Sequence, residues 1–204
     1  MKNKLFFLPV VFLFSALVVK AQKGETKLNV SYSAALPTGN FKNLVSENSF
    51  RGFSVNILHG VSDNISVGLA TGFQDFYQKY PRQLYKLSDG SDLSAVLTYS
   101  IQTMPVLAKL KYDFTPNARI QPYAAIGAGA NFIAYNRLFG EFGNKQAKIG
   151  FAARPEAGLQ IPFGKGGAGF SVGASYNIMP FKQDDLKNLN NIGLYAGFNI
   201  PMRK

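Results

Sequence analysis

The chain has 204 residues, enough for one domain, and only 16% of them are charged, against about 25% in a typical soluble domain. So low a charged fraction argues against a surface that is covered by water alone. The absence of cysteine excludes a disulfide-held fold and a cysteine metal site, and the net charge of +11 favours anionic lipid headgroups as neighbours.

The first 21 residues have the pattern of a cleaved secretory signal peptide. Residues 1–4 contain two lysines, residues 5–19 carry no charge, and Val19 and Ala21 occupy the positions that a signal peptidase reads. A membrane-anchoring helix is the alternative, but it needs about 20 apolar residues and this run is shorter. We therefore predict a signal peptide over residues 1–21 and one domain over residues 22–204. Because an exported chain does not meet nucleic acid, we expect no nucleic-acid partner.

Period-two alternation of apolar and polar residues continues almost throughout the rest of the chain, and this period is typical of β-strands. No helical period is found after the signal. The alternation predicts eight strands, each long enough to cross a bilayer when tilted. The predicted strands are residues 28–34, 51–60, 65–73, a segment within 97–114, 119–132, 151–161, 170–178 and 192–200.

Short and long connections alternate between these strands. The short ones are turn-forming tetrads at residues 61–64, 115–118 and 164–167. An up-and-down outer-membrane barrel has this layout, with short periplasmic turns, longer outside loops and both chain ends in the periplasm. We therefore predict an all-β fold, an eight-stranded antiparallel up-and-down transmembrane β-barrel. The long connections are predicted at residues 37–50, 76–96, 133–148 and 179–186.

The composition of the two strand faces indicates which one points outward. In the last two predicted strands the less apolar face consists of Gly, Ser, Asn and one Tyr, which would make a poor water-facing surface but fits the crowded interior of a small barrel. The opposite faces are apolar, with aromatic residues such as Tyr112, Phe114 and Phe198 near strand ends, where they could form interface girdles. We expect the apolar face to contact lipid. A soluble, lipocalin-like barrel is the alternative.

Several motifs carry a resemblance to a known family. A Pro-apolar-Lys-Tyr-Phe strand at residues 103–114 precedes a Pro-Tyr-x-x-x-Gly-x-Gly strand at residues 121–129, and residues 36–41 and 191–198 add to the pattern. The chain resembles the outer-membrane β-barrel domain family, of the OmpA/OmpX type. This resemblance implies a porin-like barrel in the outer membrane of a Gram-negative cell, inserted there by the barrel insertion machinery, and no reaction. Residues 199–204 depart from it, because such barrels commonly end on an aromatic residue.

The sequence offers little for catalysis or for metal binding. His59 is the only histidine, and although Ser54 and Ser62 are near it in sequence, no third catalytic member accompanies them. We expect no catalytic residue, no cofactor and no metal. Acids in the long connections could hold calcium only loosely, and we interpret them as solvated loop residues: Asp89, Asp92, Asp184 and Asp185.

Four charged residues stand opposite an apolar face within predicted strands, and they therefore point into the lumen: Lys109, Lys111, Arg154 and Glu156. Charges in a narrow interior must be paired, since an unpaired one is heavily penalised by desolvation. We interpret these residues, with Asp113 nearby, as a structural network that closes the barrel, and predict that Glu156 pairs with at least one of the bases across the lumen. A small anion-preferring pathway is the alternative.

Three functions are compatible with the sequence. The first is a non-enzymatic membrane protein, structural or surface-binding through its four long extracellular loops, with a loop-bound ligand of unknown identity. The second is a narrow porin-like channel for small solutes, and the distant third is a lipid-modifying enzyme. We expect a monomer in contact with outer-membrane lipid and lipopolysaccharide. Exposed aromatic and basic residues are expected in the second long loop, namely Phe76, Tyr77, Tyr80, Arg82, Tyr85 and Lys86.

Overall fold

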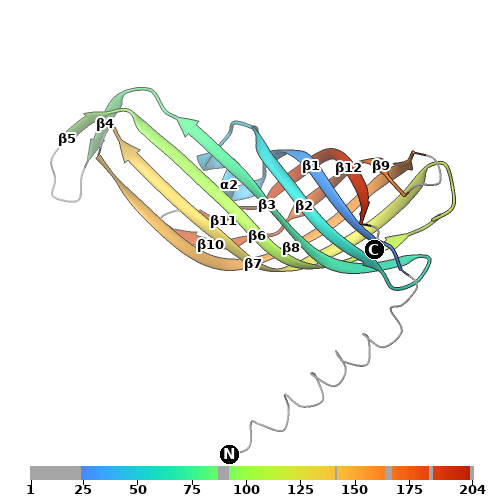
Figure 1. Ribbon diagram of the computed structural model, residues 1–204. Helices are drawn as coiled ribbons and strands as arrows, with labels where there is room; N and C mark the ends of the chain where they lie inside the picture. Colours follow the sequence, from blue (N-terminus) through green and yellow to red (C-terminus); the bar gives the residue numbers. More distant parts are fainter. Residues whose placement is uncertain (1–23, 87–91, 141, 164–166, 184–185, 203–204) are drawn as a thin grey trace, which may run out of the picture.

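The computed structural model describes residues 24–86, 92–140, 142–163, 167–183 and 186–202. Eight long antiparallel strands form a closed barrel, in the order β1, β12, β9, β8, β7, β6, β3, β2 (Figure 1). The predicted eight-stranded up-and-down antiparallel barrel is therefore confirmed. The barrel strands are β1 (Thr26–Pro37), β2 (Ser49–Gly60), β3 (Ile65–Lys79), β6 (Leu97–Asp113), β7 (Gln121–Phe139), β8 (Phe142–Pro162), β9 (Gly169–Asn177) and β12 (Asn191–Met202).

Some of the predicted features lie on residues outside the described ranges. They are the signal peptide at residues 1–21, most of the turn at 164–167, and the loop acids Asp89, Asp184 and Asp185. Among the described residues, no helix has the length and apolar character needed to span a bilayer.

The connections between β2 and β3 and between β6 and β7 lie at one end of the barrel, on the right in Figure 1, together with the first residues of β1 and the last described residues of β12. The small elements gather at the opposite end. These are the helix α2 (Gly39–Leu44) and two short hairpins, β4 (Gln83–Lys86) with β5 (Asp92–Ala95) and β10 (Pro180–Gln183) with β11 (Leu186–Asn188). The first end is periplasmic and the second extracellular in the layout of outer-membrane barrels.

The long connections differ from those expected. Residues 133–148 were expected to form a loop, but β7 and β8 continue through them as a hairpin whose last pair is Phe139 with Phe142. Gly140, with a φ of 63°, supplies the left-handed conformation that such a tight turn requires. The first long connection contains the short helix α2, although no helix was expected after the signal.

The prediction of a loop at residues 133–148 was wrong because the apolar and polar faces of the strands exchange sides along their length. In the lower part of β6, polar residues such as Lys109 point inward and apolar ones such as Leu110 outward. In its extracellular part Tyr99 and Ile101 are buried inside, while Ser100 faces out. The outer face meets lipid in the first part and water in the second, so the apolar side changes. A strand prediction that assumes an apolar outer face along the whole strand therefore places the strand end too close to the membrane.

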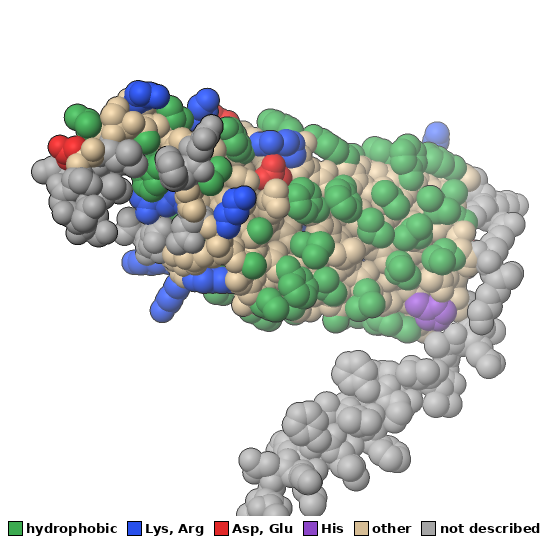
Figure 2. Space-filling model, turned by 60° about the vertical axis from the view of Figure 1, so that its left-hand side comes forward, with side chains coloured by type: hydrophobic (Ala, Val, Ile, Leu, Met, Phe, Trp, Pro, Cys, Tyr) green, Lys and Arg blue, Asp and Glu red, His purple; other side chains and the backbone are tan. Residues whose placement is uncertain are grey.

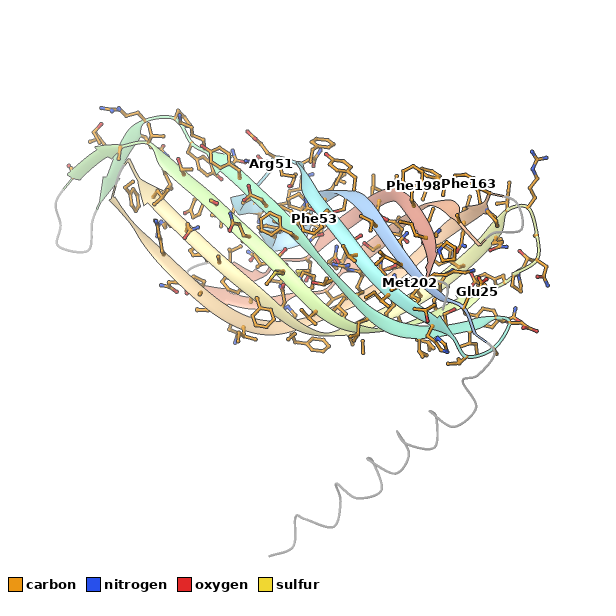
Figure 3. All side chains as sticks on the ribbon, in the orientation of Figure 1. Glu25, Arg51, Phe53, Phe163, Phe198 and Met202 are labelled. Atoms are coloured by element: carbon orange, nitrogen blue, oxygen red, sulfur yellow. The ribbon has the colours of Figure 1, made fainter. Side chains whose placement is uncertain are left out.

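The outside of the barrel wall is apolar, as expected. Large side chains on the outer face keep high exposed fractions, including Leu69 at 62% and Leu194 at 48%, whereas inner-face residues such as Ser31 are buried. Figure 2 shows the hydrophobic side chains spread over the wall. Aromatic rings gather toward both ends of this surface, with Phe163 and Phe198 near the periplasmic end and Phe53 in the other half (Figure 3). These rings match the expected interface girdles.

We predict that Val172→Arg destabilises the folded protein in lipid by about 2–4 kcal/mol, because Val172 lies on the outer face of β9 and a charge there would face hydrocarbon. The measurement is the free energy of unfolding in liposomes with urea. Val61→Arg, in an exposed periplasmic turn, is the matched control and should cost about 0–1 kcal/mol. Equal stability of the Val172 variant and the parent would mean that this face does not contact lipid.

Candidate functional site

The centre of the lumen is crossed by a buried ion pair. Lys109 on β6 and Glu156 on β8 point inward from strands separated by β7, and the Lys109 Nζ lies 2.5 Å from Glu156 Oε2. Their side chains are only 5% and 4% exposed. Buried charges of this kind are tolerated only when they are paired and hydrogen-bonded. The contact joins two parts of the wall that are not neighbours in the sheet.

Asparagine side chains extend this pair to the opposite wall. Lys109 Nζ also donates to Asn56 Oδ1 at 3.3 Å, and Asn56 in turn donates to Asn29 Oδ1 at 2.9 Å. Asn29 donates to Asn199 and to Ser171, each at 2.9 Å. A continuous chain of hydrogen bonds thus links β6, β2, β1, β12 and β9 across the lumen.

Lys109, Glu156 and the asparagines form a polar layer across the lumen, and two tyrosines continue this layer on the other side of Glu156. The Tyr195 hydroxyl donates to Glu156 Oε2 at 3.5 Å and lies 2.9 Å from the hydroxyl of Tyr123. A Cβ added at Gly173 would overlap the Tyr195 hydroxyl, so a glycine is needed beside that ring. The lumen at this level is filled by side chains, as expected for eight strands.

Lys111 lies one inward position closer to the periplasm and has partners of its own. Its Nζ is 2.8 Å from Asp113 Oδ1, donates to Gln160 Oε1 at 2.9 Å and sits 4.5 Å from the centre of the Tyr123 ring. Below it a polar vestibule of about 430 Å³ opens toward the periplasmic turns, lined among others by Lys27, Asn117 and Gln121. Water-sized solutes can therefore reach Lys111 from the periplasmic end.

Arg154 lies two residues from Glu156 on the same inner face of β8, toward the extracellular end. Its Nε donates to Asn177 Oδ1 at 2.6 Å, and Asn177 donates to Asn191 Oδ1 at 2.7 Å. Asn191 then donates to the carbonyl of Leu189 at 2.9 Å. Arg154 is thus held by neutral amides rather than by a carboxylate.

The structure brings the four predicted lumen residues onto the inner wall but joins only two of them. Glu156 contacts Lys109, whereas Lys111 pairs with Asp113 and Arg154 with Asn177. The asparagines and tyrosines that link the charges were not singled out from the sequence. Their signal is the run of inward positions that carry Asn or Tyr: Asn29, Asn56, Tyr123, Asn177, Asn191, Tyr195 and Asn199.

Above this polar layer the lumen is closed by an apolar one. Phe41 on α2 packs edge-on against Phe76 on β3 with ring centres 4.9 Å apart, and both side chains are fully buried. Phe76 was expected in an exposed loop; instead, β3 continues to Lys79 and turns this ring inward. The same cluster includes Val45, Ile101, Ile133, Met179 and Leu189. The first and the fourth extracellular connections therefore fold into the mouth of the barrel and plug it.

A cleft of about 320 Å³ lies on the extracellular side, between α2, β11 and the upper parts of β6 and β7. The Arg137 guanidinium lies 5.9 Å from the centre of the Tyr99 ring and 4.9 Å from that of Phe139. The backbone N–H of Lys187 donates to Asn40 Oδ1 at 2.7 Å, so β11 is tied to α2 at this cleft. Its lining combines a cation, two amides, two tyrosines and two leucines: Arg137, Asn40, Asn43, Tyr99, Tyr135, Leu44 and Leu186.

The residues considered for catalysis are not arranged as a catalytic site. His59 lies on the outer wall near the periplasmic end, where Figure 2 shows it in purple, and its Nδ1 is 3.0 Å from Thr26 Oγ1. Ser54 points into the lumen, and Ser62 accepts a hydrogen bond from the backbone of Ile65 in a turn. Within the described ranges, no three His, Cys, Asp or Glu residues group as metal ligands would.

Comparisons with known proteins give the same architecture. The family described as outer membrane protein beta-barrel domain matches residues 6–199. No curated protein sequence matches the chain. Among solved structures, Neisserial surface protein A is similar at 16% identity and a TM-score of 0.52, covering 88% of this chain and 97% of that one. Ail of Yersinia pestis is similar at 19% identity and a TM-score of 0.45, covering 87% and 97%.

A closed antiparallel barrel with an apolar outer wall and a polar interior is an integral outer-membrane protein. The match over most of the chain identifies it further: this chain belongs to the outer membrane protein β-barrel domain family. The resemblance noted in the sequence motifs and the expected location in the outer membrane of a Gram-negative cell are therefore confirmed.

We predict that Glu156→Gln destabilises the protein by about 3–5 kcal/mol, because it leaves the buried Lys109 ammonium without its carboxylate. The measurement is again the free energy of unfolding in liposomes. The double variant Lys109→Met with Glu156→Gln removes both charges and should recover most of the loss. If the single and the double variant are equally unstable, the cost comes from altered packing and not from an unpaired charge.

Proposed function

We propose that the protein is a non-conducting, non-enzymatic barrel that holds a binding surface at the outside of the cell. The observation that carries this proposal is the double closure of the lumen, by a buried ion-pair layer around Lys109 and Glu156 and by the apolar plug around Phe41 and Phe76. A solute would have to break both layers to pass. The extracellular elements that make the plug are then free to serve another purpose on their outer side.

The extracellular end has the chemistry to bind an anionic saccharide. The cleft beside α2 offers the Arg137 guanidinium together with the amides of Asn40 and Asn43, which can donate to phosphate, carboxylate and hydroxyl groups. Figure 2 shows Lys and Arg side chains at the extracellular end of the molecule. The exposed basic residues on the extracellular elements and strand ends are Lys42, Lys79, Arg82, Lys145, Lys182 and Lys187. We propose lipopolysaccharide, the phosphorylated glycolipid that surrounds the barrel, as the first partner of this surface.

The channel remains the second candidate because of one observation, the periplasmic vestibule. It reaches Lys111 from the periplasm and leaves only the two closed layers between that point and the outside. A lumen with Lys109, Lys111 and Arg154 would favour anions if these layers opened.

We predict no steady conductance when the refolded parent is inserted into planar bilayers in KCl, because both layers exclude ions. Insertion is checked in the same preparation by its resistance to unfolding in detergent. The supporting result is a current that stays at the level of the protein-free bilayer. Stable, anion-selective current steps from the parent would refute the closed barrel and favour the channel.

We predict that Arg137→Gln weakens binding of phosphorylated lipopolysaccharide core oligosaccharide by about tenfold or more, as expected for the loss of a charge-assisted hydrogen bond. The dissociation constant is measured by calorimetry with the full mature barrel in detergent. Arg119→Gln removes the same charge at the periplasmic end and should leave the constant unchanged. Equal binding by both variants and the parent would place the saccharide elsewhere.

A further inference from the structure

Among the residues that the structure describes, the middle of the lumen has three inward-facing cations, Lys109, Lys111 and Arg154, and only two carboxylates that pair with them. Lys109 pairs with Glu156, and Lys111 pairs with Asp113. Near the periplasmic mouth, the Nζ atom of Lys27 lies 3.7 Å from Glu25 Oε2. Arg154 makes no ion pair with any described residue. Its guanidinium has five N–H donors, of which Nε–H is used by Asn177. Glu156 lies two residues away on the same inner face, but Lys109 already engages its carboxylate, so Arg154 has no carboxylate of its own among the described residues. A buried charge without its own partner is disfavoured.

Arg154 is one of the residues that line a cavity of about 40 Å³ in the lumen. A cavity needs on the order of 10–15 Å³ by this kind of measure to hold one water molecule, so the space suits an occupant of one to three water-sized atoms. Glu156 also lines it, with its carboxylate already engaged by Lys109. The space is too small for a saccharide or a nucleotide.

Hydroxyl groups converge on the same cavity. Thr103 on β6 and Ser175 on β9 both line it, and across the described ranges neither side chain has a hydrogen-bond partner, although both residues are buried. The hydroxyls of buried residues usually have hydrogen-bond partners, so these two are available to an occupant of the cavity that they line. Together with the guanidinium, they form a set of donors from three strands that faces one small space. Such a set is complementary to an anion.

We infer that this cavity is a binding site for one monatomic anion, of the halide class, held by the Arg154 guanidinium and the hydroxyls of Thr103 and Ser175. The anion supplies the negative charge that the lumen residues lack. It sits between the ion-pair layer below and the apolar plug above, so it is an internal counter-ion of the closed barrel. The site does not depend on the extracellular cleft or on its ligand.

Bromide tests the site directly, because its anomalous X-ray signal distinguishes it from water. Crystals of the mature protein grown with sodium bromide should show an anomalous peak beside the Arg154 guanidinium, and Arg154→Gln should lose it. The melting temperature in detergent should rise and saturate as chloride replaces gluconate at constant ionic strength. Lys111→Gln, whose site has its own acid, should keep this dependence.

Thr103→Val removes one donor without changing the charge, and it serves if Arg154→Gln does not fold. It should raise the chloride concentration that gives half of the stabilisation. Water density without an anomalous signal would overturn the inference. A chloride dependence that is unchanged in both the Arg154 and the Thr103 variants would also overturn it, because the bound chloride would then be an adventitious ion only.

Discussion

The structure depends first on the requirement that every backbone N–H and C=O group inside a bilayer be hydrogen-bonded within the protein. The pairing of β1 with β12 over the whole length of β1 removes the last open strand edge and closes the wall. Closure with eight strands has a second consequence, because the interior is then only wide enough to be filled by side chains. Charged groups on the inner wall must therefore meet one another, as Lys109 and Glu156 do at 2.5 Å.

The change of solvent along the wall explains the rest of the architecture. Where lipid surrounds the barrel, the apolar residues point outward and the polar residues fill the lumen. Where the strands emerge into water, the apolar residues turn inward, and Phe76, Ile101 and Ile133 join Phe41 of α2 in a buried cluster. The extracellular part is thus an ordinary hydrophobic core built on top of a membrane barrel. The plug and the extracellular cleft beside α2 belong to that same small core, since Tyr99, Tyr135 and Leu186 take part in both.

The alternation and the turn tetrads were sufficient to predict eight strands, their order and their facing, because each is a local property of the sequence. The inward position of Lys109 and Glu156 followed from the same period. Their contact was anticipated from the narrow interior, but the partners of Arg154 and Lys111 were not, because strand stagger determines which inward residues meet. The length of the β7–β8 hairpin was also missed, since its outer face is polar above the membrane. The helix α2 is too short to leave a helical period in the sequence.

We propose that the lumen is closed to water on both sides of its middle. Because the sequence contains no cysteine, a single introduced cysteine is the only thiol and reports the access of water to its position. Thr103, which is 2% exposed, lies between the ion-pair layer and the apolar plug. A single cysteine placed there should not react with a charged, water-soluble thiol reagent added to the folded protein in liposomes, while a cysteine at the exposed turn residue Ser62 should react. Fast labelling at position 103 under these conditions would contradict the closed lumen, because it would require a water-filled path through one of the two layers.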